Sequence, residues 1–313
     1  TTLFRSVGYA FYINLVCTTT ITFCFWKELK DGFFAGGKLL DMPLAKKMLS
    51  YTWPILFLGI AGILNQTAGY IIFPYVYKDS DAHTQLGIFG AASKIAMIMS
   101  MITQAFRYAY EPFVFGKARD KDNKETYARA MKFFIIFTLL AFLVVMGYMD
   151  ILRHIIGRDY WVGLKVVPIV MAGGIMTGVY FNLSFWYKLI DKTIWGAYFS
   201  GIGCAVIIGI NVIFVPRYGY IACAWAGFMG NATAMVLSYL VGQRKYPINY
   251  PLKSIFVYLL IAGLFFAVIT YTNANLPVPA ALGINTLVII LFIAHVLYHD
   301  FPLQQLRNRI AKK

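Results

Sequence analysis

The stretch 52-TWPILFLGIAGILNQTAGYIIFPYV-76 runs for 25 residues without a charged side chain. A helix needs about 20 mainly apolar residues to cross the hydrocarbon core of a bilayer. The run is continuous rather than alternating, which favours a helix over a strand of a membrane β-barrel. Similar runs recur, and they predict spans at about 7–26, 52–76, 86–111, 128–149, 163–187, 194–215, 219–242, 254–272 and 281–298. The sequence therefore predicts an all-α, polytopic membrane helical bundle with about nine transmembrane helices.

The composition excludes an ordinary soluble domain. Of the 313 residues, 60% are hydrophobic and only 13% are charged, whereas soluble domains carry roughly 25% charged residues. A single soluble core of this size could not bury so much apolar surface. The four cysteines lie inside apolar runs without a CxxC pair, so we interpret them as small core residues rather than metal ligands or a disulfide framework. We expect no catalytic residues, no metal and no bound cofactor.

The distribution of basic residues predicts the orientation of the chain. The net charge of +15 comes from residues placed almost entirely between the apolar runs, which indicates topogenic charge and contact with anionic lipids rather than with nucleic acid. One set of alternate loops holds 20 basic residues and the other holds 6. The positive-inside rule places the richer set and the C-terminus in the cytoplasm, and Thr1 outside. Since the sequence begins without a signal-peptide pattern, we expect an N-terminal part of the natural protein to be missing.

Three ionisable residues lie in the predicted span 86–111 or at its end. Each costs roughly 2.5–3.5 kcal/mol at the centre of a membrane helix. Arg107 and Glu111 are four residues apart and could pair on one helix face, or form a charged gate at the inner mouth of a cavity. Lys94 has no acidic neighbour in its own run. It either snorkels or pairs with another helix, or it attracts an anionic substrate into a water-filled cavity.

Asparagine and glutamine side chains inside the apolar runs allow two interpretations. They either form hydrogen bonds with neighbouring helices or bind the hydroxyls of a sugar.

The sequence Gly174-x-x-x-Gly178 predicts close packing of helices. Aromatic residues near span ends are interpreted mainly as an interfacial belt, with sugar stacking as the alternative: Trp161, Trp186, Tyr187 and Trp195. The charged segment 116–132 is predicted as an interfacial helix that leads into the next span.

Three stretches together resemble a known family: 104-QAFRYAYEPFVFGKA-118, 181-FNLSFWYKLIDKTIWGAY-198 and 215-VPRYGYIACAWA-226. They resemble the oligosaccharide flippases of bacterial polysaccharide gene clusters, in the multidrug/oligosaccharidyl-lipid/polysaccharide exporter superfamily, and most of all the Bacteroidetes-type members. The resemblance covers nearly the whole chain and implies two six-helix lobes followed by two extra helices. It makes 1–51 the last helix of the first lobe and a cytoplasmic linker, 52–242 the second lobe, and 243–313 two additional helices with a basic cytoplasmic tail.

The resemblance implies a transporter rather than an enzyme. Such a flippase moves undecaprenyl-diphosphate-linked repeat units across the bacterial inner membrane by alternating access, for O-antigen, capsule or exopolysaccharide synthesis, with H⁺ or Na⁺ as a coupling ion. Its implied partners are the first lobe of the same chain, membrane lipids and the polymerase or chain-length machinery. Candidates for the substrate cavity are Asn65, Gln66, Lys94, Gln104, Arg107, Glu111 and Asn182, and candidates at the cytoplasmic end are Lys188, Asp191 and Lys192.

Two alternatives and one departure qualify this hypothesis. Relatives often carry an acidic residue and an arginine where this chain has Gly69 and Tyr70, which weakens any coupling role for that pair. A cation-coupled multidrug exporter of the same superfamily is one alternative. The other is a membrane-embedded polymerase or ligase, whose site would lie in the predicted outer loop 150-DILRHIIGRDYWVG-163 at His154, Arg158 and Asp159.

Overall fold

The computed structural model describes residues 7–28, 30, 41–78, 81–116 and 123–300. The chain divides into two compact units, residues 1–52 and 53–313. Helices make up most of the described part, and no strand occurs in it. Seven of the described helices are long and apolar enough to cross a membrane, compared with the nine predicted. They match the predicted spans from 86–111 to 281–298, and the spans predicted at 7–26 and 52–76 are not among them. The chain is therefore a multi-pass helical membrane protein, as its apolar runs predict.

The first unit contains helix α1 (Val7–Cys24) and the start of α3 (Met42–Val76). Several threonines follow one another in α1, and their hydroxyls donate to carbonyl oxygens four residues earlier: Thr18 to Asn14, Thr19 to Leu15, Thr20 to Val16 and Thr22 to Thr18, at 2.7–2.9 Å. Each hydroxyl is thus satisfied inside its own helix. The segment Phe11–Cys24 is an apolar helix shorter than the seven spanning ones.

In the second unit, most of the predicted spans are continuous helices with boundaries close to those expected, whereas the span predicted at 163–187 is divided into shorter helices. These are α4 (Ala82–Gly116), α5 (Asn123–Gly147), α7 (Val167–Leu183), α9 (Ile194–Tyr218), α10 (Tyr220–Lys245), α11 (Leu252–Asn275) and α12 (Val278–Asp300). A 3₁₀ segment, η2 (Arg158–Val166), precedes α7, and the short α8 (Phe185–Leu189) follows it. Residues 123–132 form the first turns of α5, so the separate interfacial helix predicted for 116–132 is wrong there; residues 117–122 lie outside the described part.

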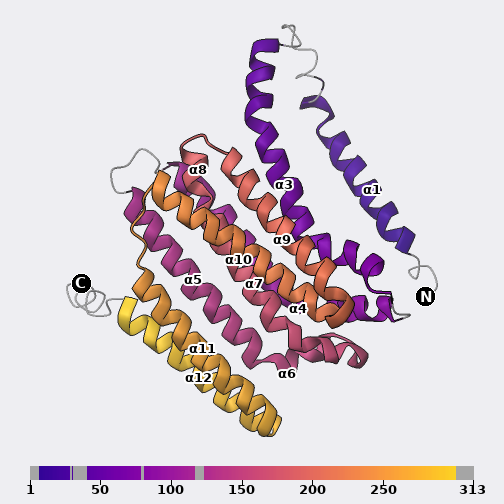
Figure 1. The fold of residues 1–313 in the computed structure, drawn as a ribbon, viewed down its shortest axis with the longest axis vertical. Coiled ribbons are helices and arrows are strands. Elements are labelled where there is room, and N and C mark those ends of the chain that lie inside the picture. The colour runs from indigo at the N-terminus through magenta and orange to yellow at the C-terminus, as the bar shows by residue number, and fades with distance from the viewer. Residues whose placement is uncertain (1–6, 29, 31–40, 79–80, 117–122, 301–313) are drawn as a thin grey trace. The chain divides into compact units, whose positions relative to one another are not determined.

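The packing order places α7 and α10 at the centre of this unit. Helix α10 packs against α9 on one side and α7 on the other, and α7 also contacts α4 and α5 (Figure 1). The glycine spacing on α7 acts as predicted. A Cβ at Gly174 would lie 2.9 Å from Met99 Cγ, and one at Gly178 would lie 2.3 Å from Phe134 Cζ. Only glycine permits these approaches, which bring α7 close to α4 and α5.

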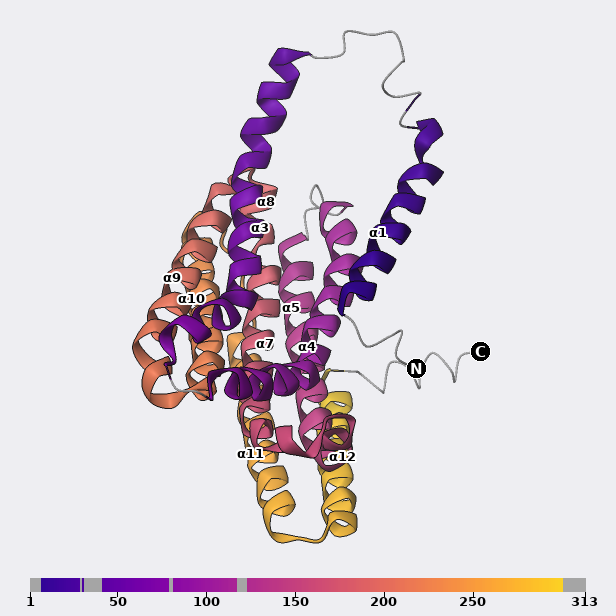
Figure 2. The same cartoon turned by 90° about the vertical axis from the view of Figure 1, so that its right-hand side faces the viewer.

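Helices α11 and α12 form a hairpin that packs along α5 (Figures 1 and 2). At one end, Asn285 donates to the Gly147 carbonyl oxygen at 3.0 Å and to Asn273 Oδ1 at 2.7 Å. At the other end, Lys132 pairs with Asp300, which also accepts a 2.8 Å hydrogen bond from the Tyr258 hydroxyl. Polar contacts therefore fasten the hairpin to both ends of α5.

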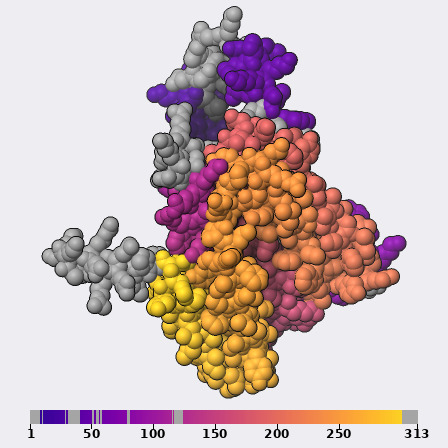
Figure 3. Space-filling view, turned by 60° about the vertical axis from the view of Figure 1, so that its left-hand side comes forward, coloured from indigo at the N-terminus to yellow at the C-terminus, as the bar shows by residue number. Residues whose placement is uncertain are grey.

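The outer surface of the hairpin is strongly apolar, and Figure 3 shows it in orange and yellow. Large side chains exposed along α11 and α12 include Phe256, Leu260, Leu264, Leu287 and Leu291. Such a surface suits contact with lipid chains rather than with water.

The aromatic belt prediction is wrong for two residues. Trp186 and Tyr187 of α8 are only 2% and 1% exposed. They pack with Phe199 and with the partly buried Trp195 in an apolar cluster between α8, α9 and α10. The α8 segment turns these rings inward, which sequence position near a span end does not show.

Candidate functional site

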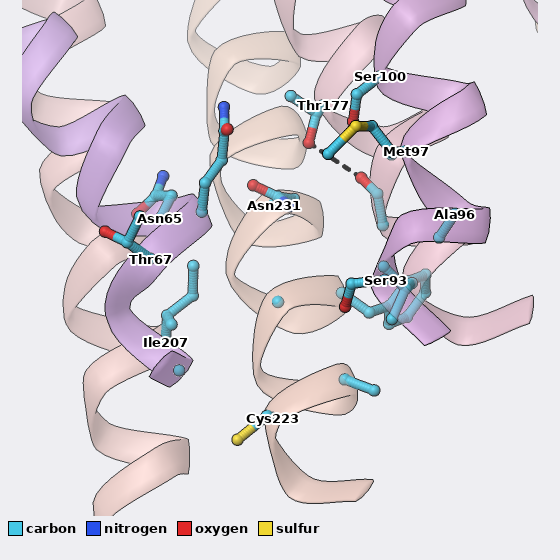
Figure 4. A pocket seen from close by; sticks show the side chains of 18 of the residues that line it. Asn65, Thr67, Ser93, Ala96, Met97, Ser100, Thr177, Ile207, Cys223 and Asn231 are labelled. Carbon is cyan, nitrogen blue, oxygen red and sulfur yellow. Dashed lines mark hydrogen bonds between the residues drawn. The ribbon is translucent and has the colours of Figure 1, made fainter. Parts of the chain in front are cut away.

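A polar cavity of about 380 Å³ lies in the second unit, between α3, α4, α7, α9 and α10. Figure 4 shows Asn65 and Thr67 of α3 on one side, Ser93 and Ser100 of α4 on the other, and Asn231 of α10 between them. Its amides come from Asn65, Gln66, Gln104, Asn211 and Asn231, and its hydroxyls from Thr67, Ser93, Ser100, Thr103 and Thr177. These groups lie inside helices that are otherwise apolar, which marks the cavity as the leading candidate site.

Small residues and aromatic rings complete the walls. Gly69, Gly173, Gly174 and Gly227 line the cavity. A Cβ at Gly227 would meet no atom within 4 Å, whereas one at Gly173 or Gly174 would meet Phe228 or Met99. The aromatic residues in the lining are Tyr70, Phe89, Phe181 and Phe228. The wall therefore combines hydrogen-bonding groups with flat apolar faces.

Several acceptor atoms of the lining residues are buried without a hydrogen-bond partner among the described residues. These are Asn65 Oδ1, Gln104 Oε1 and Asn211 Oδ1, together with the Thr103 hydroxyl oxygen. Asn211 is fully buried, and its Nδ2 donates to the Ile207 carbonyl oxygen at 2.8 Å. That bond fixes the amide so that Oδ1 remains the unpaired atom. An unsatisfied buried acceptor costs about 1–3 kcal/mol. The protein itself covers these oxygens, so they lie behind the wall of the cavity and not on its open surface.

The lining residues, all of them described, include no charged side chain. Lys94 is exposed on α4 and does not line the cavity. Arg107 lies just beyond it, with its guanidinium 5.2 Å from the centre of the Phe181 ring. Glu111 pairs with Lys188 of α8, Nζ to Oε1 at 2.8 Å, rather than with Arg107. The charges on α4 therefore lie outside the neutral cavity.

The remaining predicted residues lie apart from the cavity. Asn182 is buried and donates to the Gly178 carbonyl oxygen at 3.1 Å. It borders a small void that Arg107 also lines. Asp191 and Lys192 are exposed in the turn between α8 and α9.

Of the predicted residues, Asn65, Gln66 and Gln104 line the cavity, whereas Thr103, Asn211 and Asn231 line it without having been singled out. Asn211 and Asn231 are the amides within the predicted spans 194–215 and 219–242. An amide inside an apolar run is the signal that could have found them.

The outer-loop residues considered for an enzyme, His154, Arg158 and Asp159, are all exposed. His154 packs edge-on against Trp161 with ring centres 5.6 Å apart, and Arg153 stacks on the same ring while pairing with Asp150 at 3.0 Å. Within the described residues, no group of three or more His, Cys, Asp or Glu side chains could hold a metal ion. The loop is a small folded cap between α5 and α7.

No protein-family model matches the chain, and no curated protein sequence matches it significantly. Among solved structures, the chain is similar to "Lipid II flippase MurJ, inward closed conformation" with a TM-score of 0.52 and 15% sequence identity. The match covers 93% of this chain and 82% of that structure. At this identity the likeness establishes the fold. The chain therefore shares the helical membrane fold of that flippase.

Proposed function

We propose that this chain is a flippase that moves undecaprenyl-diphosphate-linked oligosaccharide repeat units from the inner to the outer leaflet for surface polysaccharide synthesis. The observation that carries the proposal is a cavity lined by uncharged amides and hydroxyls, inside an apolar bundle that shares its fold with a lipid II flippase. In such a mechanism two lobes rock about a binding site and expose it alternately to each side of the membrane.

The neutral lining favours this function over a cation-coupled drug exporter of the same superfamily. Such exporters place acidic residues in the cavity. In this chain, Glu111 is the carboxylate that follows the lining residues of α4 in sequence, and it is already paired with Lys188. Amides and hydroxyls match the hydroxyl-rich surface of a sugar instead.

The proposed membrane, orientation and partners follow from the distribution of basic residues and from the fold. The chain lies in the bacterial inner membrane with its C-terminus in the cytoplasm, as the distribution of basic residues predicts. Its partners are the first lobe of the same protein, membrane lipids and the polymerase or chain-length machinery. A proton or sodium gradient drives transport.

Deletion of the gene that encodes this chain tests the proposal. We expect undecaprenyl-linked repeat units to accumulate in the inner leaflet, as measured by their accessibility to a sugar-modifying enzyme in intact spheroplasts. Drug susceptibility measured on the same strain serves as the comparison. If the repeat units still reach the outer leaflet in a strain without a second exporter, the proposal is wrong. Drug hypersensitivity with normal repeat-unit exposure would support the drug exporter.

A further inference from the structure

We infer that the cavity between α3, α4, α7, α9 and α10 binds the neutral sugar rings of the substrate and not its diphosphate. The inference rests on the proposed function, because it assigns one part of the lipid-linked substrate to one part of the chain. Three features of the cavity support it: its uncharged amides and hydroxyls, its aromatic faces and the position of the nearest charges.

The lining offers both kinds of hydrogen-bonding group but no charge. Its amides and hydroxyls can donate to and accept from the hydroxyls and N-acetyl groups of a sugar. An ionised diphosphate would enter a lining whose residues include no basic side chain. Removing an ionised group from water without a partner charge is strongly unfavourable. The uncharged lining therefore disfavours the diphosphate and fits the sugar.

A metal cation also binds to oxygen atoms, but this lining disfavours it. The residues around the cavity carry no carboxylate, so a cation entering it would lose its water without gaining a counter-charge. Removing an ion from water without a partner charge is strongly unfavourable.

The apolar part of the lining suits sugar rings equally well. A sugar ring has C–H groups on its faces and hydroxyls around its edge. Phe181 of α7 and Phe228 of α10 supply flat apolar surfaces beside the amides. Binding sites for small molecules characteristically combine such surfaces with a few placed polar groups, in volumes of about 300–1,000 Å³. The cavity of about 380 Å³ lies within that range.

The nearest basic groups follow the cavity along α4. Lining residues on α4 extend from Phe89 to Gln104, and Arg107 comes one turn later beside Phe181. Lys188 and Glu111 lie further toward the same end of α4. The basic groups that could meet a diphosphate therefore lie past the cavity, toward the end of α4 that is predicted to be cytoplasmic. A lipid anchored in the inner leaflet would present its diphosphate there and its sugars deeper.

A cysteine-protection experiment tests the inference. Cys17, Cys24, Cys204 and Cys223 are replaced by alanine in the full-length protein, and Ser93→Cys places a reporter thiol in the cavity. The alkylation rate by N-ethylmaleimide is measured in lipid nanodiscs during titration with a panel of neutral disaccharides, with inorganic diphosphate, or with sodium chloride in place of choline chloride. We expect at least one disaccharide to slow alkylation about tenfold at about ten times its dissociation constant, because labelling follows the unoccupied fraction.

Variants of the lining residues distinguish sugar binding in the cavity from general effects of the sugar on the protein. Asn211→Leu should abolish protection by the sugar, and Gln104→Leu provides a second variant if the first does not fold. Asn275→Leu is the matched control, since Asn275 is exposed and bonds only to Tyr271 in its own helix. A Lys192→Cys reporter in the exposed α8–α9 turn should label at the same rate with and without sugar.

The outcomes distinguish this inference from the proposed function. If no disaccharide protects Ser93→Cys, or if diphosphate or sodium protects it instead, the inference is overturned. Unchanged protection in both Asn211→Leu and Gln104→Leu also overturns it. If the deletion strain then shows a flipping defect while sugars give no protection, the proposed function stands and the sugars bind elsewhere. Protection by sugar in a protein whose deletion leaves flipping intact supports the site and overturns the proposed function.

Discussion

Asp191 adopts a backbone conformation that glycine favours. It lies in the turn between α8 and α9 with φ of 56°, where a Cβ is crowded by the backbone. Asp and Asn tolerate this region better than other residues. We expect Asp191→Val to lower the free energy of unfolding by about 1–2 kcal/mol, whereas Asp191→Gly should leave it unchanged or raise it. Thermal unfolding in detergent measures both, with Lys192→Val in the same turn as the control. Equal losses in Asp191→Val and Lys192→Val would contradict this interpretation.

The Glu111–Lys188 ion pair joins α4 to α8, and its two side chains are 33% and 24% exposed. A double-mutant cycle with Glu111→Gln and Lys188→Met should give a coupling energy of about 1 kcal/mol. The pair Glu125–Arg129 is the control, because its side chains are 70% and 65% exposed and lie on one helix. Its coupling should not exceed about 0.5 kcal/mol. A larger coupling in the exposed pair would show that partial burial does not strengthen the first pair.

At the scale of elements, α9 and α10 approach closely at two glycines. A Cβ at Gly203 would lie 2.9 Å from the Gly230 carbonyl oxygen, and one at Gly230 would lie 2.2 Å from Ile207 Cγ1. We expect Gly203→Ala to destabilise the protein by about 1–3 kcal/mol, because the helices must separate. Gly201→Ala, two residues earlier on α9, meets no atom within 4 Å and is the matched control. If both variants unfold at the same temperature, α9 and α10 are not tightly packed at these glycines.

The hairpin of α11 and α12 depends on Asn285, which is fully buried. Its amide donates to the Gly147 carbonyl oxygen and to Asn273, and its Oδ1 accepts a 2.7 Å bond from the Thr272 hydroxyl. We expect Asn285→Ala to cost about 2 kcal/mol, because the Gly147 carbonyl oxygen and Asn273 Oδ1 lose this donor, while the Thr272 hydroxyl keeps its 2.9 Å bond to the Ile269 carbonyl oxygen. Faster protease cleavage in the 246–251 segment would report the loosened hairpin. Asn275→Ala should show neither effect, and a similar change in both variants would argue against a specific role for Asn285.

The helices were predictable because each apolar run is long, and turns or charges separate the runs. The run 194–215 was predicted from composition, and α9 covers it. The partners between helices were not predictable in the same way. Glu111 has Arg107 four residues away in sequence, yet it pairs with Lys188, because α8 folds back toward the end of α4. Sequence spacing determines helix faces, whereas long-range pairing depends on the packing of the helices.

At the scale of the whole molecule, the distribution of basic residues predicts which loops face the cytoplasm. In a cysteine-free background, Lys245→Cys at the C-terminal end of α10 should react with a membrane-impermeant maleimide only after the cells are permeabilised. Pro277→Cys, between α11 and α12, should react in intact cells, because consecutive loops lie on opposite sides of the membrane. The reverse pattern would place the C-terminus outside.

Only part of the cavity lining could be predicted, because the lining comes from five helices and the sequence does not show which helices lie side by side. Asn65, Gln66 and Gln104 stood out as amides in apolar runs, but Asn211 did so only once α3, α4, α7, α9 and α10 were packed around one space. Lys94 and Arg107 drew attention because charge is costly in a membrane. They lie outside the lining because an ionic group can be accommodated at the surface of a bundle, or against an aromatic ring, as Arg107 is against Phe181.

The contacts of α5 with the hairpin also have a consequence for biosynthesis. A ribosome completes α5 long before Asp300 and Asn285 are made, so Lys132 and the Gly147 carbonyl oxygen enter the bilayer without the partners they have in the finished structure. During that interval, the Lys132 ammonium group lacks the carboxylate that it pairs with in the finished structure. Completion of α12 supplies the missing partner at both ends of α5. A chain that stops before α12 would therefore lack both of these partners of α5.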